Sequence, residues 1–230
     1  MMEVITKDCT ALDDLELAEM ADISASGEAR LEVGLLSKLK DEWVLVTKIT
    51  DTNRLLGFSF ASLERIGGTP SILIAVASFV REDVAKEAMK LLMKDLYRRA
   101  LLAFPGEDVL VSTKMSSYFG YQAYAGLHDI LPIEGHKPTG EERAWARRLA
   151  KRFSLDSQID DRTFLARGNG SPVAVFDYQP FGEEEFDIDQ DRSLEICKSV
   201  FEQVDRGNYD CVIPLGWAMA EDLANGMLPK

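Results

Sequence analysis

The sequence has little of the chemistry that marks a metal or redox site. Only three cysteines occur among 230 residues, at Cys9, Cys197 and Cys211, and they form no C-x-x-C motif. The two histidines, His128 and His136, form no H-E-x-x-H pattern, so we expect surface or hydrogen-bonded roles for them. The sequence therefore predicts reduced, mostly buried thiols and no metal site.

Positive charge and long apolar runs are also scarce. Lys and Arg number 26 against 39 Asp and Glu, which gives a formal net charge of −13. Such a surface repels phosphate backbones and anionic lipids, so we expect neither a nucleic-acid partner nor a membrane. The N-terminus lacks the order of a signal peptide, and the longest weakly polar stretch, Ser71 to Val80, is about half of a membrane span. We therefore expect a cytoplasmic protein.

Common catalytic and ligand-binding motifs are missing. The sequence contains no G-x-S-x-G, no P-loop and no G-x-G-x-x-G after a strand. The acids Asp187, Asp189 and Asp191 are spaced like the start of a calcium-binding loop. Arg192 and Lys198, however, stand where that loop needs a glycine and a bidentate glutamate. We expect a solvated acidic loop there.

The first part of the chain carries clear hydrophobic periodicity. Alternating or continuous apolar runs predict strands, and apolar residues three or four apart predict helices. The helix after residue 82 has the strongest pattern, and a tyrosine-rich helix follows the next strand. The expected strands lie at Val4–Ile5, Trp43–Ile49, Leu55–Leu63, Ser71–Val80 and Asp108–Thr113, and the expected helices at 14–23, 28–40, 83–100 and 116–127.

A boundary is expected near residue 135, where Gly135, Pro138 and Gly140 follow one another. It divides the chain into residues 1–135 and a C-terminal α/β extension, 136–230. Thr139 and Glu142 have the spacing of a capping box. The extension is expected to hold helices at 139–153 and from Asp191 to Val204, a hairpin of Thr163–Arg167 with Pro172–Tyr178, and a last strand at Cys211–Leu215.

The order of these elements resembles the acyl-CoA N-acyltransferase (GNAT) superfamily over roughly residues 3–133. The most specific piece is Ile74–Arg81 running into the helix at Asp83, which is similar to the family's fourth strand and cofactor-binding turn. A second piece, Tyr121 to Leu127, resembles the aromatic-x-x-x-x-Gly-Phe pattern after the family's fifth strand. The resemblance implies an α+β fold with a mixed, mostly antiparallel central sheet flanked by helices.

The resemblance also implies a co-substrate, acyl-CoA or acetyl-CoA, and a place for it. Backbone N–H groups of the fourth strand would polarise the thioester carbonyl, and the turn at the start of the next helix would hold the pyrophosphate. Val84 and Lys86 replace glycines of the family's turn, and Glu82 and Asp83 add negative charge. The residues implied for cofactor binding are Ala77, Ser78, Val80, Arg81, Lys86 and Ala88.

For catalysis the resemblance implies Glu64 as the base that deprotonates an amine and Tyr121 as the acid that protonates the leaving thiolate. The acceptor would be a small-molecule or peptide amine, and the extension would cover the acceptor side or build a homodimer interface. The alternative is a non-catalytic member: the same fold kept as a binding or assembly module with a degraded CoA site. The departures in the turn and the absence of a carboxylate in strand 71–80 favour the alternative.

Overall fold

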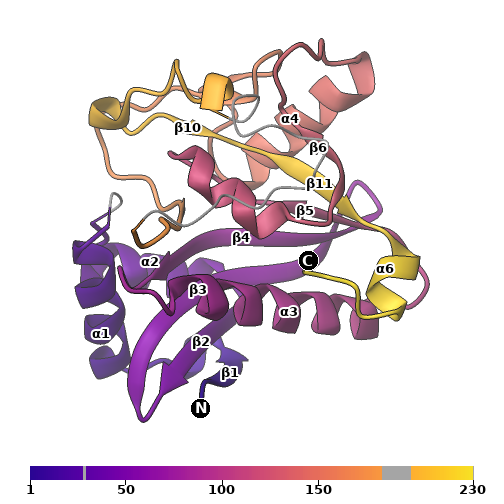
Figure 1. The fold of residues 1–230 in the computed structure, drawn as a ribbon. Coiled ribbons are helices and arrows are strands. Elements are labelled where there is room, and N and C mark those ends of the chain that lie inside the picture. Colours follow the sequence, from indigo (N-terminus) through magenta and orange to yellow (C-terminus); the bar gives the residue numbers. More distant parts are fainter. Residues whose placement is uncertain (28–29, 183–197, 230) are drawn as a thin grey trace.

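A mixed sheet forms the centre of the computed structural model, which describes residues 1–27, 30–182 and 198–229 (Figure 1). Only two strand pairs in it are parallel, both of them involving the fourth strand. The predicted α+β fold with a mostly antiparallel central sheet is confirmed. The strand order is β1 (Glu3–Asp8), β2 (Leu45–Asp51), β3 (Arg54–Ile66), β4 (Thr69–Phe79), β5 (Val109–Ser112), β11 (Leu215–Ala218) and β6 (His128–Leu131), with β9 (Phe176–Asp177) paired to β4 beside this path.

Helices cover this sheet. The helix α3 (Ala85–Ala103) packs along β1 to β4 and lies in front of the sheet in Figure 1. Its buried residues Ala88, Leu92, Leu96 and Ala100 recur at helical spacing, as the sequence predicts. The helix α1 (Asp14–Ala25) packs against α2 (Val33–Glu42) and against the strands β3 and β4. The chain crosses from β4 through α3 to β5, which pairs with β4 in parallel.

Two predicted helices differ from the observed ones. The second helix was expected from residue 28, but α2 begins at Val33, because Arg30 has φ +42°, a left-handed conformation that a helix cannot include. The tyrosine-rich segment forms a 3-10 helix, η2 (Tyr118–Tyr124), and not an α-helix. All five residues from Gly120 to Tyr124 are buried, so this segment lies within the core.

The predicted hairpin between Thr163–Arg167 and Pro172–Tyr178 is wrong. The strand β8 (Leu165–Ala166) pairs instead with β7 (Ile159–Asp160) and β10 (Cys211–Val212) in a small second sheet. The strand β9, which was the other arm of the hairpin, pairs with β4. The predicted last strand is split as well, because Pro214 has no N–H and separates β10 from β11. The helix α4 (Gly140–Arg152) is confirmed, including its capping box from Thr139.

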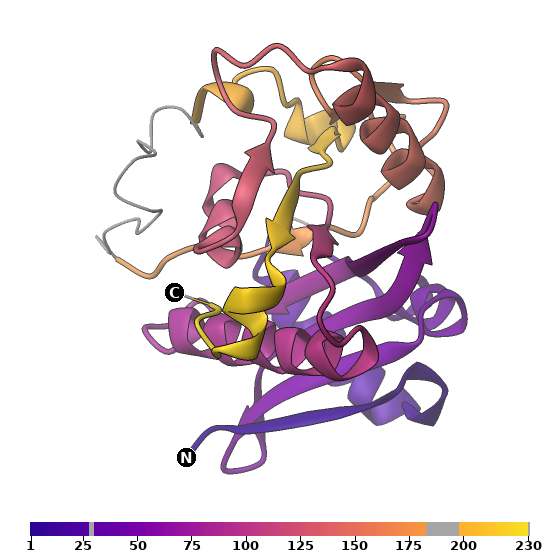
Figure 2. The same ribbon diagram turned by 90° about the vertical axis from the view of Figure 1, so that its right-hand side faces the viewer.

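The two parts expected on either side of residue 135 share one sheet. The strand β11 lies between β5 and β6 and pairs with both, as the yellow arrow between them shows in Figure 2. Buried residues from both parts belong to one hydrophobic core. The short helix α6 (Ala220–Ala224), which follows β11, contacts α3. The C-terminal part is thus built into the N-terminal sheet, since β5 would otherwise leave an unpaired edge there.

The cysteines and acidic residues singled out above fall partly within the described residues. Cys9 and Cys211 are buried free thiols, and burial raises their pKa values to about 12 and about 11. Cys197 and the acids Asp187, Asp189 and Asp191 lie outside the described residues. Among the helices that the structure describes, none combines the length and the apolar character needed to cross a bilayer.

Candidate functional site

The edge of β4 that faces β5 is divided between two partners. Its first half pairs with β5 only over Ser71–Leu73, opposite Leu110–Ser112. Beyond Leu73 the two strands separate, although the Thr113 hydroxyl still donates to the Ile74 carbonyl at 2.8 Å. The second half of β4, which contains Ala77 and Ser78, therefore faces an opening between the strands. These two residues are among those expected from the sequence to bind an acyl donor.

The strand β9 fills this opening. It runs parallel to β4 with Phe176 opposite Ala77 and Asp177 opposite Ser78. The N–H of Ala77 donates to the Val175 carbonyl at 3.3 Å, and the N–H of Phe176 donates to the Lys114 carbonyl at 2.7 Å, so the segment bridges both sides of the opening. We name residues Val175–Asp177 the plug segment. Beyond Leu73 the backbone N–H and C=O groups of β4 have no hydrogen-bond partners on β5. The plug segment supplies partners for some of these groups, which would otherwise be buried without any.

Side chains also hold the plug segment. The Phe176 ring is 1% exposed and packs with its centroid 5.8 Å from that of Phe79 on β4. Nη2 of Arg81 donates to Oδ1 of Asp177 at 2.7 Å, and the Asp177 side chain is only 3% exposed. The loop after α1 covers this ion pair, because a Cβ added to Gly27 would lie 1.9 Å from Asp177 Oδ2. Arg81, which was expected to bind the pyrophosphate of the cofactor, is thus paired with the carboxylate of Asp177.

The remaining residues expected at the cofactor have ordinary structural surroundings. The N–H of Val80 donates to the Leu56 carbonyl at 2.9 Å, and Ala88 is fully buried on α3. The Ser78 hydroxyl is buried and makes no hydrogen bond within the described residues. Lys86 is partly exposed in the first turn of α3. Glu82, just before that turn, accepts two hydrogen bonds from the exposed Arg54 side chain, which compensates its negative charge.

The two expected catalytic residues lie in different surroundings. Glu64 accepts hydrogen bonds from Nε of Arg152 at 2.9 and 3.1 Å, on the strand next to β4. The Tyr121 side chain is 1% exposed, and its hydroxyl donates to the Pro132 carbonyl at 2.9 Å. Its ring packs edge-on against Phe201, 5.8 Å between centroids. The two side chains come from different elements, Glu64 from β3 and Tyr121 from η2.

The Tyr121 hydroxyl is expected to contribute to stability through this buried hydrogen bond. In Tyr121→Phe the Pro132 carbonyl loses its donor, so we expect the free energy of unfolding to fall by about 1 kcal/mol. Urea denaturation followed by circular dichroism measures the change. The half-buried Tyr209, replaced by Phe, is the matched control and should change the stability by less. An unchanged midpoint for Tyr121→Phe would mean that the hydrogen bond adds nothing.

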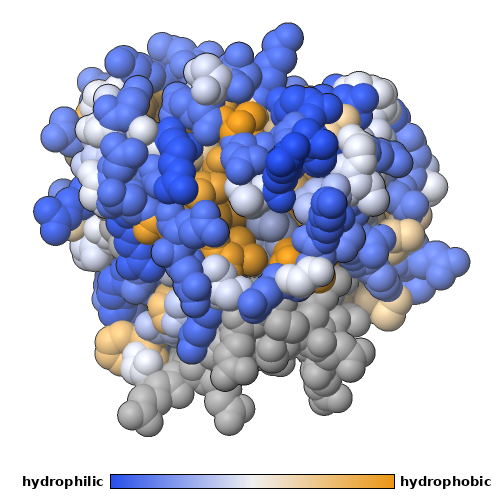
Figure 3. Space-filling model, turned by 90° about the horizontal axis from the view of Figure 1, so that it is seen from above, coloured by the Kyte–Doolittle hydropathy of each residue, from blue (hydrophilic) through white to orange (hydrophobic). Residues whose placement is uncertain are grey.

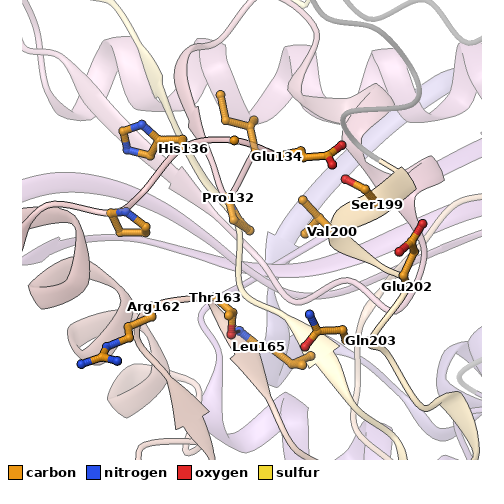
Figure 4. A pocket seen from close by; sticks show the side chains of 13 residues that line it. Pro132, Glu134, His136, Arg162, Thr163, Leu165, Ser199, Val200, Glu202 and Gln203 are labelled. Atoms are coloured by element: carbon orange, nitrogen blue, oxygen red, sulfur yellow. Dashed lines mark hydrogen bonds between the residues drawn. The ribbon is translucent and has the colours of Figure 1, made fainter.

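A separate pocket of about 390 Å³ lies at the end of the molecule formed by the C-terminal part. Figure 3 views this end and shows apolar residues at the bottom of a hollow with hydrophilic residues around it. Figure 4 shows the side chains of Glu134, Glu202 and Arg162 around the pocket, with Leu165 and Val200 nearby. The described lining residues include two carboxylates and one guanidinium, so this part of the lining is negative on balance, which favours a cationic ligand over an anion.

Both histidines are hydrogen-bonded, as expected. Nε2 of His136, at the same pocket, lies 2.9 Å from Oε2 of Glu142 on α4. Nε2 of His128 lies 2.9 Å from Oδ2 of Asp222 on α6. Among the described residues no three potential ligands come together in a way that would hold a metal ion. Each histidine therefore ties a strand or loop to a helix.

No protein-family model and no curated protein sequence matches this chain. Three acetyltransferases are among the solved structures to which it is similar, each at low identity. An aminoglycoside 6'-N-acetyltransferase from Enterococcus faecium is 12% identical over 48% of this chain and 61% of its own, with a TM-score of 0.38. An aminoglycoside 6'-acetyltransferase type Ii is 12% identical over 56% of this chain and 86% of its own, with a TM-score of 0.40. A ribosomal-protein-alanine N-acetyltransferase from Brucella melitensis is 14% identical over 44% of this chain and 74% of its own, with a TM-score of 0.32. The chain thus spans about three fifths of the length of the first.

Proposed function

We propose that this protein is a GNAT-like, non-catalytic binding or assembly module in which the chain itself closes the acyl-donor site. The observation that carries the proposal is the pairing of the plug segment with β4 at Ala77 and Ser78. The N–H of Ala77, which the resemblance assigns to the thioester carbonyl, already donates to Val175. A donor thioester needs such an N–H free and aimed at its oxygen.

The charge around the start of α3 supports the same proposal. A helix N-terminus binds phosphate through free N–H groups and positive charge. Here Asp83 is exposed, the carboxylate of Glu82 is paired with Arg54, and the guanidinium of Arg81 is paired with Asp177. Lys86 is left as the cation of this turn. One lysine beside the Asp83 carboxylate makes a poor partner for a pyrophosphate dianion.

One observation favours a second candidate, acyl transfer from acetyl-CoA or another acyl-CoA to a small-molecule or peptide amine. The plug segment is short, and β4 and β5 pair over only three residues, so its displacement would expose an opening between them. The pocket with Glu134 and Glu202 suits a cationic acceptor by charge. In this candidate Glu64 and Tyr121 keep the roles implied by the resemblance, and the plug segment has to move before a donor binds.

Calorimetric titration with acetyl-CoA and free CoA tests the proposal. We expect no heat of binding and no rise in melting temperature for the wild type at millimolar ligand, because the site is filled by the chain. Asp177→Ala serves as the companion variant, since it loosens the plug segment at one end. Micromolar binding to either protein would overturn the proposal and favour the acyltransferase, and an amine screen with a thiol-release assay would follow.

A further inference from the structure

A second pocket, of about 430 Å³, lies between α2, the end of α4 and the chain that leads into the plug segment. It is distinct from the opening between β4 and β5 and from the pocket in Figure 4, with which it shares no residue. Its mouth contains the exposed residues Glu42, Ser154 and Pro172. Its interior is formed by side chains that are each less than 9% exposed: Leu39, Trp43, Lys114, Phe153, Leu155 and Ala174.

Among the described residues of this lining, Lys114 is the only charged side chain that is buried. The residue is 6% exposed, and its Nζ lies 5.3 Å from the centroid of the Phe153 ring. Within the described part of the chain Nζ makes no hydrogen bond and no ion pair. Lys114 and Phe153 both line the pocket, so the ammonium is placed at the pocket wall. An ammonium has three donors, which at this wall are open to an acceptor that enters the pocket.

Arg152 is the second cation of the lining, but its charge is already compensated. Its Nε donates to both carboxylate oxygens of Glu64, and its guanidinium stacks 4.1 Å from the centroid of the Trp43 ring. The pocket therefore offers one cation, Lys114, that has no hydrogen-bond or ion-pair partner among the described residues, beside apolar side chains. A carboxylate satisfies a single ammonium, whereas a phosphate dianion is usually held by several donors. Pockets of this size and lining hold small, mostly apolar molecules through a few polar groups.

We propose that this pocket binds a small organic carboxylate with an apolar body, whose carboxylate group accepts hydrogen bonds from Lys114 Nζ. The apolar body lies against Leu39, Trp43 and Leu155. The proposal does not depend on whether the donor site binds CoA, because the two sites use different side chains.

The ionisation of Lys114 agrees with this arrangement and supplies a signature. Burial, together with the positive charge of Arg152 on α4, lowers the pKa of Lys114 to about 8, although Cys211 on β10 and Glu42 on α2 act to raise it. A bound carboxylate stabilises the ammonium and raises this pKa. Binding near pH 8 is therefore expected to take up protons, and the affinity should fall as the pH rises above 8.

Octanoate is the probe, with 1-octanol as its neutral counterpart, each titrated calorimetrically into the protein of residues 1–230. We expect octanoate to bind at least tenfold more tightly than octanol, and Lys114→Met to lose about tenfold or more of the octanoate affinity. Lys151→Met, which removes an exposed lysine on the same helix as Arg152, is the matched control and should bind as the wild type does.

Two further results decide the proposal without the variant, should Lys114→Met fail to fold. Titration of the wild type in two buffers of different ionisation enthalpy at pH 8 should show proton uptake with octanoate and none with octanol. No octanoate binding, equal affinity for octanol, or binding without proton uptake would each overturn the proposal. A folded Lys114→Met variant with undiminished octanoate affinity would overturn it as well.

Discussion

Replacing Asp177 by alanine is expected to lower the free energy of unfolding by about 3 kcal/mol, because it leaves a partly buried guanidinium without its carboxylate. The Arg81 side chain is 24% exposed and Asp177 3%, so the ion pair is largely removed from water. Nη1 of Arg81 is buried and makes no hydrogen bond within the described residues, so little else compensates this charge. The residual exposure of Arg81 places the effect at the lower end of the range for buried pairs.

A double-mutant cycle separates the unpaired charge from simple loss of contacts. Arg81→Met should recover part of the stability lost in Asp177→Ala, since the uncompensated charge is then gone. Urea unfolding of the wild type, both single variants and the double variant gives the coupling energy. Asp41→Ala, an exposed acid on α2, is the control and should stay within about 0.5 kcal/mol of the wild type. If Asp177→Ala cost no more than this control, the ion pair would not hold the plug segment.

The same variant connects stability with function. Asp177 pairs with Ser78 on β4, and its neighbour Phe176 packs on Phe79, so the plug segment is fixed both by hydrogen bonds and by its core ring. Loosening only the ion pair leaves the ring in place. A protein in which the plug segment is a permanent part of the core will therefore lose stability in Asp177→Ala without gaining affinity for CoA.

The sequence predicts those elements whose pattern is local. The strand β4 reads as a continuous apolar run, and α3 carries its apolar residues three and four apart, so both were expected within a few residues of their observed bounds. The capping box of α4 follows from Thr139 and Glu142 alone. The mostly antiparallel central sheet was expected from the resemblance that the order of these elements carries.

The plug segment could not be found in this way. Val175–Asp177 lies about a hundred residues after its partner strand β4, and its apolar pattern fits a hairpin with Thr163–Arg167 equally well. What decides between the partners is the unpaired edge of β4, which exists only because β5 diverges after Leu73. Lys114 was missed for a related reason: a single lysine after a strand has no motif, and its burial depends on α2 and α4 packing over it.

Glu16 is expected to give the protein a strong dependence of stability on acid pH. Burial raises the pKa of this carboxyl, but hydrogen bonds from Lys48 and Lys7 and from the backbone of Asp13 outweigh burial and lower the pKa to about 2. Nζ of Lys7 lies 2.6 Å from Oε2, and Lys48 contacts Oε1. The Glu16 side chain is 16% exposed, so solvent screens these contacts only in part. The contacts tie α1 to β1 and β2.

The lowered pKa of Glu16 in the folded state determines how the stability changes with pH. An unfolded glutamate has a pKa of about 4.3, so the folded state is favoured above that pH, and the advantage is lost as the pH falls from about 4.5 towards 2. The lowering corresponds to about 3 kcal/mol. Glu16→Gln should lack this contribution at neutral pH and should show a flatter profile between pH 4.5 and 2 in urea titrations. Glu19→Gln, an exposed residue of the same helix, should reproduce the wild-type slope. Parallel profiles for Glu16→Gln and the wild type would mean that the lysines hold the carboxyl no better than water does.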